Sequence, residues 1–238
     1  MAPLLFGHRG ASALAPENTM AAFSRAIADG ADGVELDVRL CRSGELVVAH
    51  DPDLRRVSEP GSIGELTLGE LRARDLGGGE KVPLLDEVLD LATGGRFMVD
   101  VEVKTNGPRG AEVAGELCRR LSFRALESAD HILVSSFDPR ALAVVRFRAP
   151  RLASGLLFGS KQRWLLRSGL LAVPLGASAV HPELRLVSPA LVRAWHRMRR
   201  AVNVWTVDDP PALRRLRDLR VDAIITNDPG AARRALEG

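Results

Sequence analysis

Residues Val34–Leu40 read VELDVRL, and residues Val99–Lys104 read VDVEVK. In both stretches an apolar side chain alternates with a charged one, which is the pattern of a β-strand with two different faces. The valines and leucines are expected to point toward covering helices, and the charged side chains toward the interior. Two neighbouring strands would then aim carboxylates at one region near their C-terminal ends, where parallel barrels carry their active sites.

The rest of the chain repeats one unit, a short β-rich run followed by a longer helical stretch, which is typical of a parallel sheet wrapped by helices. Strands are predicted at Leu4–Arg9, Val34–Leu40, Phe97–Lys104, His131–Phe137, Leu152–Phe158, Ala177–Pro182, Val202–Val207 and Ala223–Thr226. Helices are predicted at Thr19–Asp29, Leu84–Ala92, Arg109–Leu121, Pro139–Phe147, Lys161–Leu171, Pro189–Arg199, Pro210–Leu219 and Gly230–Leu236. A length of 238 residues suits an α/β fold of the (β/α)₈ TIM barrel type. An open doubly wound sheet is the alternative, because periodicity does not show whether a sheet closes.

One segment after the second predicted strand interrupts this alternation. A turn is expected there, and Leu46–Ala49 then returns as a short strand that brings His50 beside Asp37. The glycine-rich residues 52–83 follow. We interpret them as a small cap insertion over the site, within a single domain that spans residues 1–238.

The composition is that of an ordinary globular protein, with 46% hydrophobic and 26% charged residues. A formal net charge of +3 is too small to indicate a nucleic-acid partner, although it suits a small anionic substrate. No apolar run approaches the roughly 20 residues needed to span a bilayer, and the N-terminus lacks the features of a signal peptide. Cys41 and Cys118 lie far apart, as expected for reduced thiols. We therefore predict a cytoplasmic location.

Three of the predicted inward carboxylates suit a metal site. Glu35, Asp37 and Glu102 would repel one another if they were crowded at the barrel mouth, so each needs a proton or a cation. A divalent ion bound by all three resolves this repulsion, and oxygen ligands select Mg²⁺, Ca²⁺ or Mn²⁺ over zinc. The alternative is that the acids form structural ion pairs with Arg39, Arg9 or Lys104, and spacing alone does not separate the two interpretations.

Two histidines favour the catalytic interpretation. His8 closes the first predicted strand and His50 closes the returning hairpin strand, so both imidazoles are expected at the same mouth. A pair of histidines beside carboxylates suits general acid–base chemistry near neutral pH. Arg9 and Lys104 add positive charge for a phosphoryl group, Arg9 as a bidentate fork and Lys104 as a point charge.

Several short motifs occur in an order and spacing that resembles the glycerophosphodiester phosphodiesterases. They are His8-Arg9-Gly10, Pro16-Glu17-Asn18-Thr19, Val34–Val38, His50-Asp51-Pro52 and Glu102-Val103-Lys104, followed by Val134–Asp138, Val204–Asp208 and Ile224–Pro229. Each motif is weak by itself, but the ordered set extends over essentially the whole chain.

The resemblance implies a (β/α)₈ barrel that cleaves glycerophosphodiesters to glycerol 3-phosphate and an alcohol. The three carboxylates would hold one divalent metal ion, the two histidines would be the acid and the base, and Arg9 and Lys104 would hold the phosphate. Trp205 is expected to face inward, either within the core or as a wall for the glycerol or alcohol. One alternative is a lysophospholipase D or phospholipase-C-like enzyme with a larger alcohol. Another is a non-catalytic barrel that binds phosphodiesters, against which the presence of both histidines argues.

Other polar residues receive structural interpretations. Glu17 and Asn18 are expected to cap the first helix and brace the first histidine. Asp100 is expected a layer deeper than the metal ligands, His181 is expected to be structural, and His196 has no neighbours that suggest chemistry.

The predicted helix Lys161–Leu171 mixes cations with apolar residues around Trp164. Helices of this makeup can lie on anionic membranes, with tryptophan at the interface. The competing interpretation is that the apolar residues pack against the barrel. We favour packing, because an outer barrel helix must already bury an apolar stripe.

Overall fold

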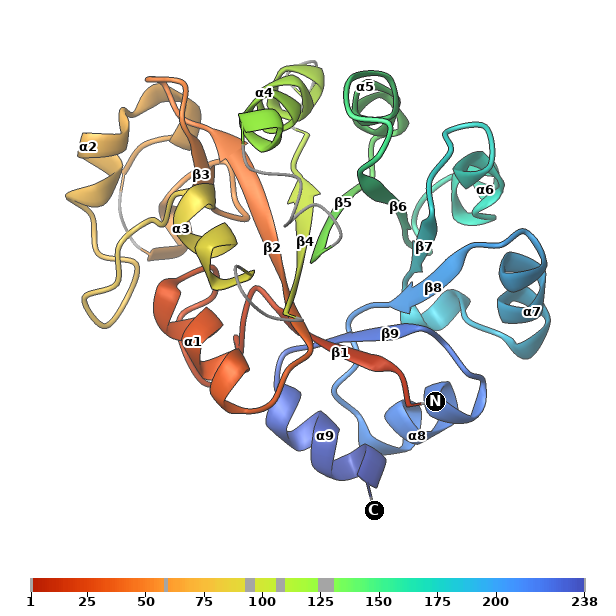
Figure 1. The fold of residues 1–238 in the computed structure, drawn as a ribbon. Coiled ribbons are helices and arrows are strands. Elements are labelled where there is room, and N and C mark those ends of the chain that lie inside the picture. Colours follow the sequence, from red (N-terminus) through yellow and green to blue (C-terminus); the bar gives the residue numbers. More distant parts are fainter. Residues whose placement is uncertain (1, 58–59, 93–96, 106–109, 124–130, 238) are drawn as a thin grey trace.

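The strands form one closed ring surrounded by helices (Figure 1). The structure is a computed structural model that describes residues 2–57, 60–92, 97–105, 110–123 and 131–237. The strand order is β1-β9-β8-β7-β6-β5-β4-β2, and β1 also pairs with β2, which closes the ring. Each of these pairings is parallel. The predicted TIM barrel is therefore confirmed, and the open-sheet alternative is wrong.

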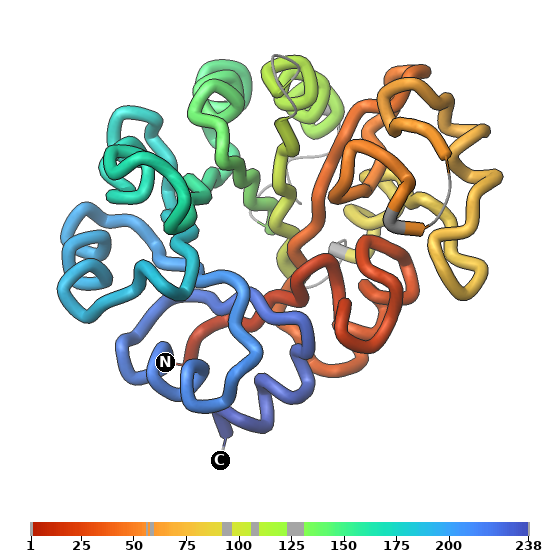
Figure 2. Tube along the Cα trace, turned by 180° about the vertical axis from the view of Figure 1, so that it is seen from behind, coloured from red at the N-terminus to blue at the C-terminus, as the bar shows by residue number. Residues whose placement is uncertain are grey.

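The elements follow the predicted alternation closely. The barrel strands are β1 (Leu4–His8), β2 (Gly33–Leu40), β4 (Met98–Val103), β5 (Ile132–Ser136), β6 (Ala153–Phe158), β7 (Ala179–Pro182), β8 (Ala201–Val204) and β9 (Ala223–Thr226). The helices around them are α1 (Met20–Ala28), α3 (Leu85–Leu89), α4 (Gly110–Phe123), α5 (Pro139–Arg148), α6 (Trp164–Arg167), α7 (Pro189–Arg197), α8 (Pro210–Asp218) and α9 (Pro229–Glu237). Arg109, the predicted start of one helix, lies outside the described residues. Figure 2 shows from behind that the helical segments encircle the strands.

The two faces of β2 point as the alternation predicts. Val34, Leu36 and Val38 are fully buried in a cluster that also holds Phe23 of α1 and Leu117 of α4. Burying these aliphatic side chains between sheet and helix stabilises each by about 1.5–3 kcal/mol. The charged face of β2 is therefore turned inward.

The register between β2 and β4 sets the inward acids side by side. Glu35 lies opposite Asp100, and Asp37 lies opposite Glu102. Because parallel strands share one direction, these acids approach the same C-terminal edge of the barrel. The register thus brings together carboxylates that lie far apart in the sequence.

The predicted hairpin is present. Strand β3 (Leu46–Val48) runs antiparallel to β2 and pairs Val48 with Val38. The Ala49 amide then donates to the carbonyl oxygen of Asp37 at 2.9 Å, so His50 follows directly at the edge where the inward acids lie. Residues 52–83, called the cap below, include the short helix α2 (Leu68–Arg72), and residues 58–59 within them lie outside the described part. A separate apolar cluster packs the cap; it includes Val47, Leu54, Ile63, Leu71 and Val82.

Helix α1 begins differently from the prediction. Thr19 is its N-cap, and the Thr19 hydroxyl accepts a hydrogen bond from the Ala22 amide. The extended backbone of Thr19 suits a cap, whereas Asn18 has the left-handed φ of 59°. The predicted capping role of Glu17 and Asn18 is therefore wrong, and both side chains turn toward the barrel mouth instead.

The predicted helix Lys161–Leu171 is also wrong in length. Helix α6 is a single turn that ends before Gly169, which has a left-handed φ of 73°. A Cβ atom at this position would lie 2.7 Å from Nε1 of Trp195, so the close packing excludes a larger residue. Leu171 packs against the core, but Trp164 is 67% exposed. The favoured interpretation, that Trp164 packs against the barrel, is therefore wrong.

Candidate active site

Three buried carboxylates form a cluster at the C-terminal edge of β2 and β4. One oxygen from each of Glu35, Asp37 and Glu102 lies within 4.8 Å of the others. Strand alternation directs all three inward, and the β2–β4 register aligns Asp37 with Glu102. The cluster, called the triad below, could hold a metal ion, and an all-carboxylate donor set suits a hard divalent ion.

The charges of the triad are not balanced. Burial raises the pKa of Glu35 well above its usual range, and repulsion from Asp37 adds to the effect. Burial also raises the pKa of Glu102 to about 7. Burial opposes ionisation of Asp37 too, but attraction to Lys104 and Arg9 outweighs it and lowers the pKa of Asp37. Without a bound cation the glutamates therefore tend to hold protons, which a divalent ion would displace.

The ion pairs of the alternative interpretation are present for Lys104 and Arg9, whereas the Arg39 guanidinium donates to the carbonyl oxygen of His50 at 2.9 Å. The Lys104 ammonium lies 2.9 Å from Oδ1 of Asp37 and 2.7 Å from Oε1 of Glu102. The Arg9 guanidinium lies 3.2 Å from Oδ2 of Asp37. Among the described residues, the one basic side chain within 4.0 Å of the Glu35 carboxylate is His8, which carries charge only when it is protonated. Lys104 and Arg9 therefore offset the charge of Asp37 and Glu102 but leave Glu35 without a fixed cation.

The turn after β1 fixes the first histidine and Arg9. Arg9 has φ 55°, and its amide donates to the Glu35 carboxylate at 3.1 Å. The next residue, Gly10, has φ 83°, and a Cβ there would lie 2.6 Å from the backbone of Ala22. A left-handed arginine is uncommon and costs about 1–3 kcal/mol, so the contacts around it hold the turn in place. Glu17 contributes one of them, an ion pair with Arg9 at 2.9 Å.

Both predicted catalytic histidines lie at this mouth, each with one ring nitrogen engaged. Nδ1 of His8 is 2.7 Å from Oδ1 of Asn227, and Nδ1 of His50 is 2.7 Å from Oδ1 of Asp51. Burial lowers the pKa of both histidines, so the neutral rings prevail at neutral pH. When the ring is neutral, an oxygen partner at Nδ1 assigns the proton to that nitrogen and leaves Nε2 with a free lone pair.

Asn227 is a residue whose role the sequence analysis missed. Its side-chain amide donates to Asp208 at 2.6 Å, and Ser12 donates to its oxygen at 2.9 Å. These two contacts orient the Asn227 oxygen toward His8, so they set the tautomer of the imidazole. The available signal was the place of Asn227, directly after the last predicted strand and thus at the catalytic edge.

A cavity of about 160 Å³ unites the predicted site residues. It is lined by His8, Arg9, Glu35, His50, Glu102, Lys104, Phe137, Leu157, Trp205 and Ile225. Asp37 is the one predicted site residue outside this lining, because it lies fully buried beneath. Trp205 is half-buried and forms a wall, held by a hydrogen bond from its indole to the carbonyl of His181 at 2.7 Å. Its ring also packs edge-to-face on Phe137, with centroids 5.5 Å apart.

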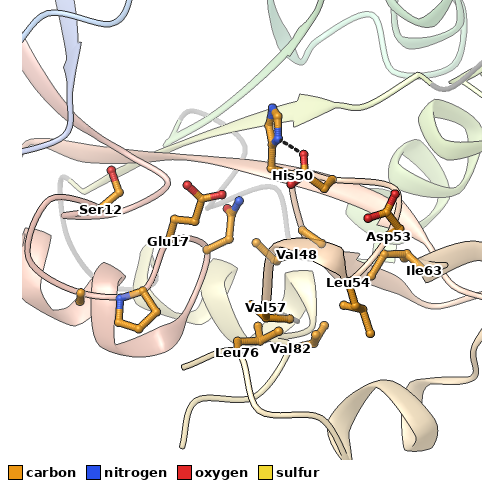
Figure 3. A pocket seen from close by; sticks show the side chains of 15 residues that line it. Ser12, Glu17, Val48, His50, Asp53, Leu54, Val57, Ile63, Leu76 and Val82 are labelled. Carbon is orange, nitrogen blue, oxygen red and sulfur yellow. Dashed lines mark hydrogen bonds and ion pairs between the residues drawn. The ribbon is translucent and has the colours of Figure 1, made fainter. Parts of the chain in front are cut away.

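A second cavity, of about 300 Å³, lies between the barrel mouth and the cap and shares His50 with the first. Figure 3 shows Ser12 and Glu17 on one side of it and apolar cap residues on the other, with the His50–Asp51 hydrogen bond at its rim. The apolar wall includes Val48, Leu54, Val57, Ile63, Leu76 and Val82. The mouth therefore continues from a charged pocket into a mixed polar and apolar one.

Asp100, His181 and His196, for which the sequence suggested no catalytic role, line neither of these two cavities. Asp100 is buried, and burial raises its pKa to about 8. It lies 3.4 Å from Nδ1 of His181, whose pKa burial lowers to about 3. Asn203 contacts the other ring nitrogen of His181 at 3.0 Å. The prediction that His196 has no chemical neighbour is wrong, since its Nε2 lies 2.8 Å from Asp222.

In the metal-free protein, Glu102→Gln is expected to gain stability over wild type as pH rises from about 5 to 8. The folded pKa of about 7 lies above the ordinary value of 4.5, so the stability that the bound proton provides is full below 4.5 and is lost through pH 7. Glutamine mimics the protonated acid, so the difference in unfolding free energy should grow by on the order of 2 kcal/mol. Urea denaturation in chelator measures it, with the exposed Glu65→Gln as control. If the difference in unfolding free energy between Glu102→Gln and wild type shrinks as pH rises, the raised pKa of Glu102 is contradicted.

Comparisons with known proteins agree with this geometry. A model of the "Glycerophosphoryl diester phosphodiesterase family" matches residues 8–231. The glycerophosphodiester phosphodiesterase of Caldanaerobacter subterraneus subsp. tengcongensis is 35% identical over 237 residues and covers 96% of each chain. The "Probable glycerophosphodiester phosphodiesterase 1" of Mycobacterium tuberculosis is 36% identical over 257 residues, which cover 99% of this chain and 93% of that protein.

A solved structure gives the same fold. An Oleispira antarctica phosphodiesterase, in complex with the product sn-glycerol-3-phosphate, superposes with a TM-score of 0.89 at 25% identity. The match covers 100% of this chain and 98% of that chain.

The barrel and its mouth define an enzyme, a hydrolase of phosphoric diesters. The chain belongs to the glycerophosphoryl diester phosphodiesterase family, which confirms the predicted family and the prediction of an enzyme. Within the described residues, no helix combines the length and the apolar character needed to cross a membrane. The cytoplasmic location and the lack of a nucleic-acid partner stay predictions.

Proposed function

We propose that the protein hydrolyses glycerophosphodiesters to glycerol 3-phosphate and an alcohol, with one divalent metal ion and two histidines. The observation that carries the proposal is one small cavity lined by His8, His50, Arg9, Lys104 and the two glutamates of the triad, with Asp37 buried next to them. The product complex of the Oleispira antarctica phosphodiesterase supports the choice of glycerol 3-phosphate. The match of the family model over residues 8–231 supports the reaction class.

The triad would hold Mg²⁺, Ca²⁺ or Mn²⁺, since hard ions prefer carboxylate oxygens. Such an ion, when bound, supplies charge that neutralises the phosphate and polarises a phosphoryl oxygen. The ion pairs of the triad support this role. Lys104 and Arg9 pair with Asp37, whereas Glu35 has only His8 within ion-pair distance among the described residues. Once the carboxylates are neutralised, Lys104 and Arg9 keep positive charge for the phosphate.

The two histidines would move the protons. One imidazole, through its free Nε2, removes the proton from the nucleophilic hydroxyl, and the other, protonated, gives its proton to the leaving alcohol oxygen. The P–O bond to the alcohol breaks as the new P–O bond forms. The nucleophile is either water or the free glycerol hydroxyl of the substrate, which would give a cyclic phosphate first. Trp205 would form a wall for the glycerol or the alcohol.

A lipid diester, with an acyl chain on its glycerol, is the second candidate. The cavity beneath the cap has about 300 Å³ and an apolar wall, and it shares His50 with the charged pocket. A lysophospholipase D or phospholipase-C-like reaction would place its bulkier group there. The same triad and histidines would then serve a lipid diester.

Release of glycerol 3-phosphate from glycerophosphocholine tests the proposal. Turnover is expected with Mg²⁺, Ca²⁺ or Mn²⁺, and it should disappear in chelator and return when one of these ions is added. A parallel assay with lysophosphatidylcholine decides between the two candidates, and phosphorus NMR detects a cyclic phosphate. Equal turnover with and without chelator would contradict the proposed metal dependence. Absence of turnover on every diester would contradict the proposed activity.

A further inference from the structure

An exposed apolar group lies on the outer surface at α6. Trp164, Leu165 and Leu170 are exposed by 67%, 44% and 49%. The cations Lys161, Arg163 and Arg167 are also exposed and flank them in the sequence. We call these six residues the α6 patch. An outer barrel helix normally buries its apolar stripe, so three large apolar side chains exposed within residues 164–170 point to a contact surface.

The charge of this segment has one sign. Residues 159–176 contain Lys161, Arg163 and Arg167 but no aspartate or glutamate. Neither arginine forms a salt bridge with an acid among the described residues. A second copy of the chain docked on the same patch would set three cations against three cations, because a two-fold contact pairs a surface with itself. The patch instead complements an anionic surface.

The α6 patch begins beside the catalytic mouth. The loop that leads into it leaves the C-terminal end of β6, and its Ser160 amide and hydroxyl both donate to Glu183 at 2.7 Å. A Cβ at Gly159, in the same loop, would lie 3.6 Å from the ring of Trp205. The loop before the patch therefore runs close to the tryptophan that forms one wall of the cavity.

We propose that the α6 patch docks the protein on an anionic lipid surface, with the catalytic mouth close to the lipid headgroups. Tryptophan is suited to the boundary between headgroups and acyl chains, and lysine and arginine extend their charged ends to anionic lipids. The docking itself needs no activity. Its consequence for substrates rests on the proposed function: phosphodiesters held in a lipid surface reach the mouth more readily than they would from solution.

Vesicle binding tests the docking. The full chain is mixed with vesicles of phosphatidylcholine alone or with added phosphatidylglycerol, and binding is measured by cosedimentation. Binding is expected with the anionic vesicles, and salt should weaken it. Trp164→Ala should weaken it by roughly tenfold, and Arg163→Gln or Arg167→Gln by about fivefold each. Phe147→Ala is the matched control, because Phe147 is 89% exposed and flanked by arginines, but lies at the far end of α5.

Three outcomes would overturn the docking: no binding to anionic vesicles at low salt, equal losses for Trp164→Ala and Phe147→Ala, or a wild-type dimer that Trp164→Ala dissociates. Turnover separates this inference from the proposed function. Trp164→Ala should hydrolyse glycerophosphocholine at the wild-type rate and lose turnover of lysophosphatidylcholine in anionic vesicles. Salt-sensitive vesicle binding without turnover of any diester would support the docking and overturn the activity.

Discussion

Removing one charge from the triad is expected to abolish activity and divalent-ion binding together. Glu35→Gln, Asp37→Asn and Glu102→Gln keep the shape of each side chain but remove an anionic ligand. Each variant should lower kcat/KM by about 10³-fold or more, since the loss of the ion's charge stabilisation costs several kcal/mol. Calorimetric titration with Mn²⁺ and assays of glycerol 3-phosphate release measure the two losses.

Asp100→Asn is the matched control for these variants. Asp100 is a buried acid of the same strand as Glu102, and its raised pKa of about 8 leaves it largely protonated at neutral pH. Asparagine resembles that protonated form, so divalent-ion affinity should stay near wild type. A triple variant of the triad that still turned over substrate in chelator would refute the assignment of the metal site.

Loss of either of the two histidines proposed as acid and base is expected to lower kcat by about 10²-fold or more. His8→Ala and His50→Ala remove a proton-transfer group from the cavity but leave the triad in place. Divalent-ion affinity should therefore change little, which separates these variants from those of the triad. Steady-state assays of glycerol 3-phosphate release measure kcat, and calorimetric titration measures the divalent-ion affinity.

The pH profile gives a second measure of the histidines. Burial lowers the pKa of His8 and His50 below the ordinary value of 6.5, so the acidic limb of a bell-shaped kcat/KM profile should lie below pH 6.5. The apparent values belong to the coupled pair rather than to one residue. His196→Ala, at an exposed pair with Asp222, should keep wild-type kinetics and the wild-type profile. Wild-type kcat in His8→Ala or His50→Ala would remove that histidine from the mechanism.

The fold was largely predictable because strand alternation is a local property. Val34–Leu40 carries its two faces in its own sequence, and the structure confirms both directions. Closure of the barrel was predicted from the chain length and the family resemblance rather than from periodicity, because it depends on the pairing of β1 with both β2 and β9. The length of α6 was mispredicted for a similar reason. Gly169, which follows α6, has a left-handed backbone, and a Cβ atom there would meet Trp195, a residue of another helix.

The candidate site was likewise predictable only where it depends on local sequence pattern. Glu35, Asp37 and Glu102 could be grouped from sequence, since parallel strands deliver inward residues to one edge. The hydrogen-bond partner of His8 could not be predicted from sequence. Asn227 lies 219 residues away and reaches His8 only when the ring of strands has closed. The exposure of Trp164 was equally hidden, since an apolar residue in a helical pattern is usually buried.

The contact between His8 and Asn227 has a consequence for biosynthesis. All three acids and both histidines precede residue 105, so a ribosome makes every reactive group before it has made half of the chain. The oxygen that holds the His8 ring arrives only with the loop after β9, the last strand to emerge. Contacts of such long sequence separation form slowly. The proposed proton transfer by His8 would therefore begin only at the end of folding, and a nascent or C-terminally clipped chain would carry its acids and imidazoles without the contact that orients the His8 ring.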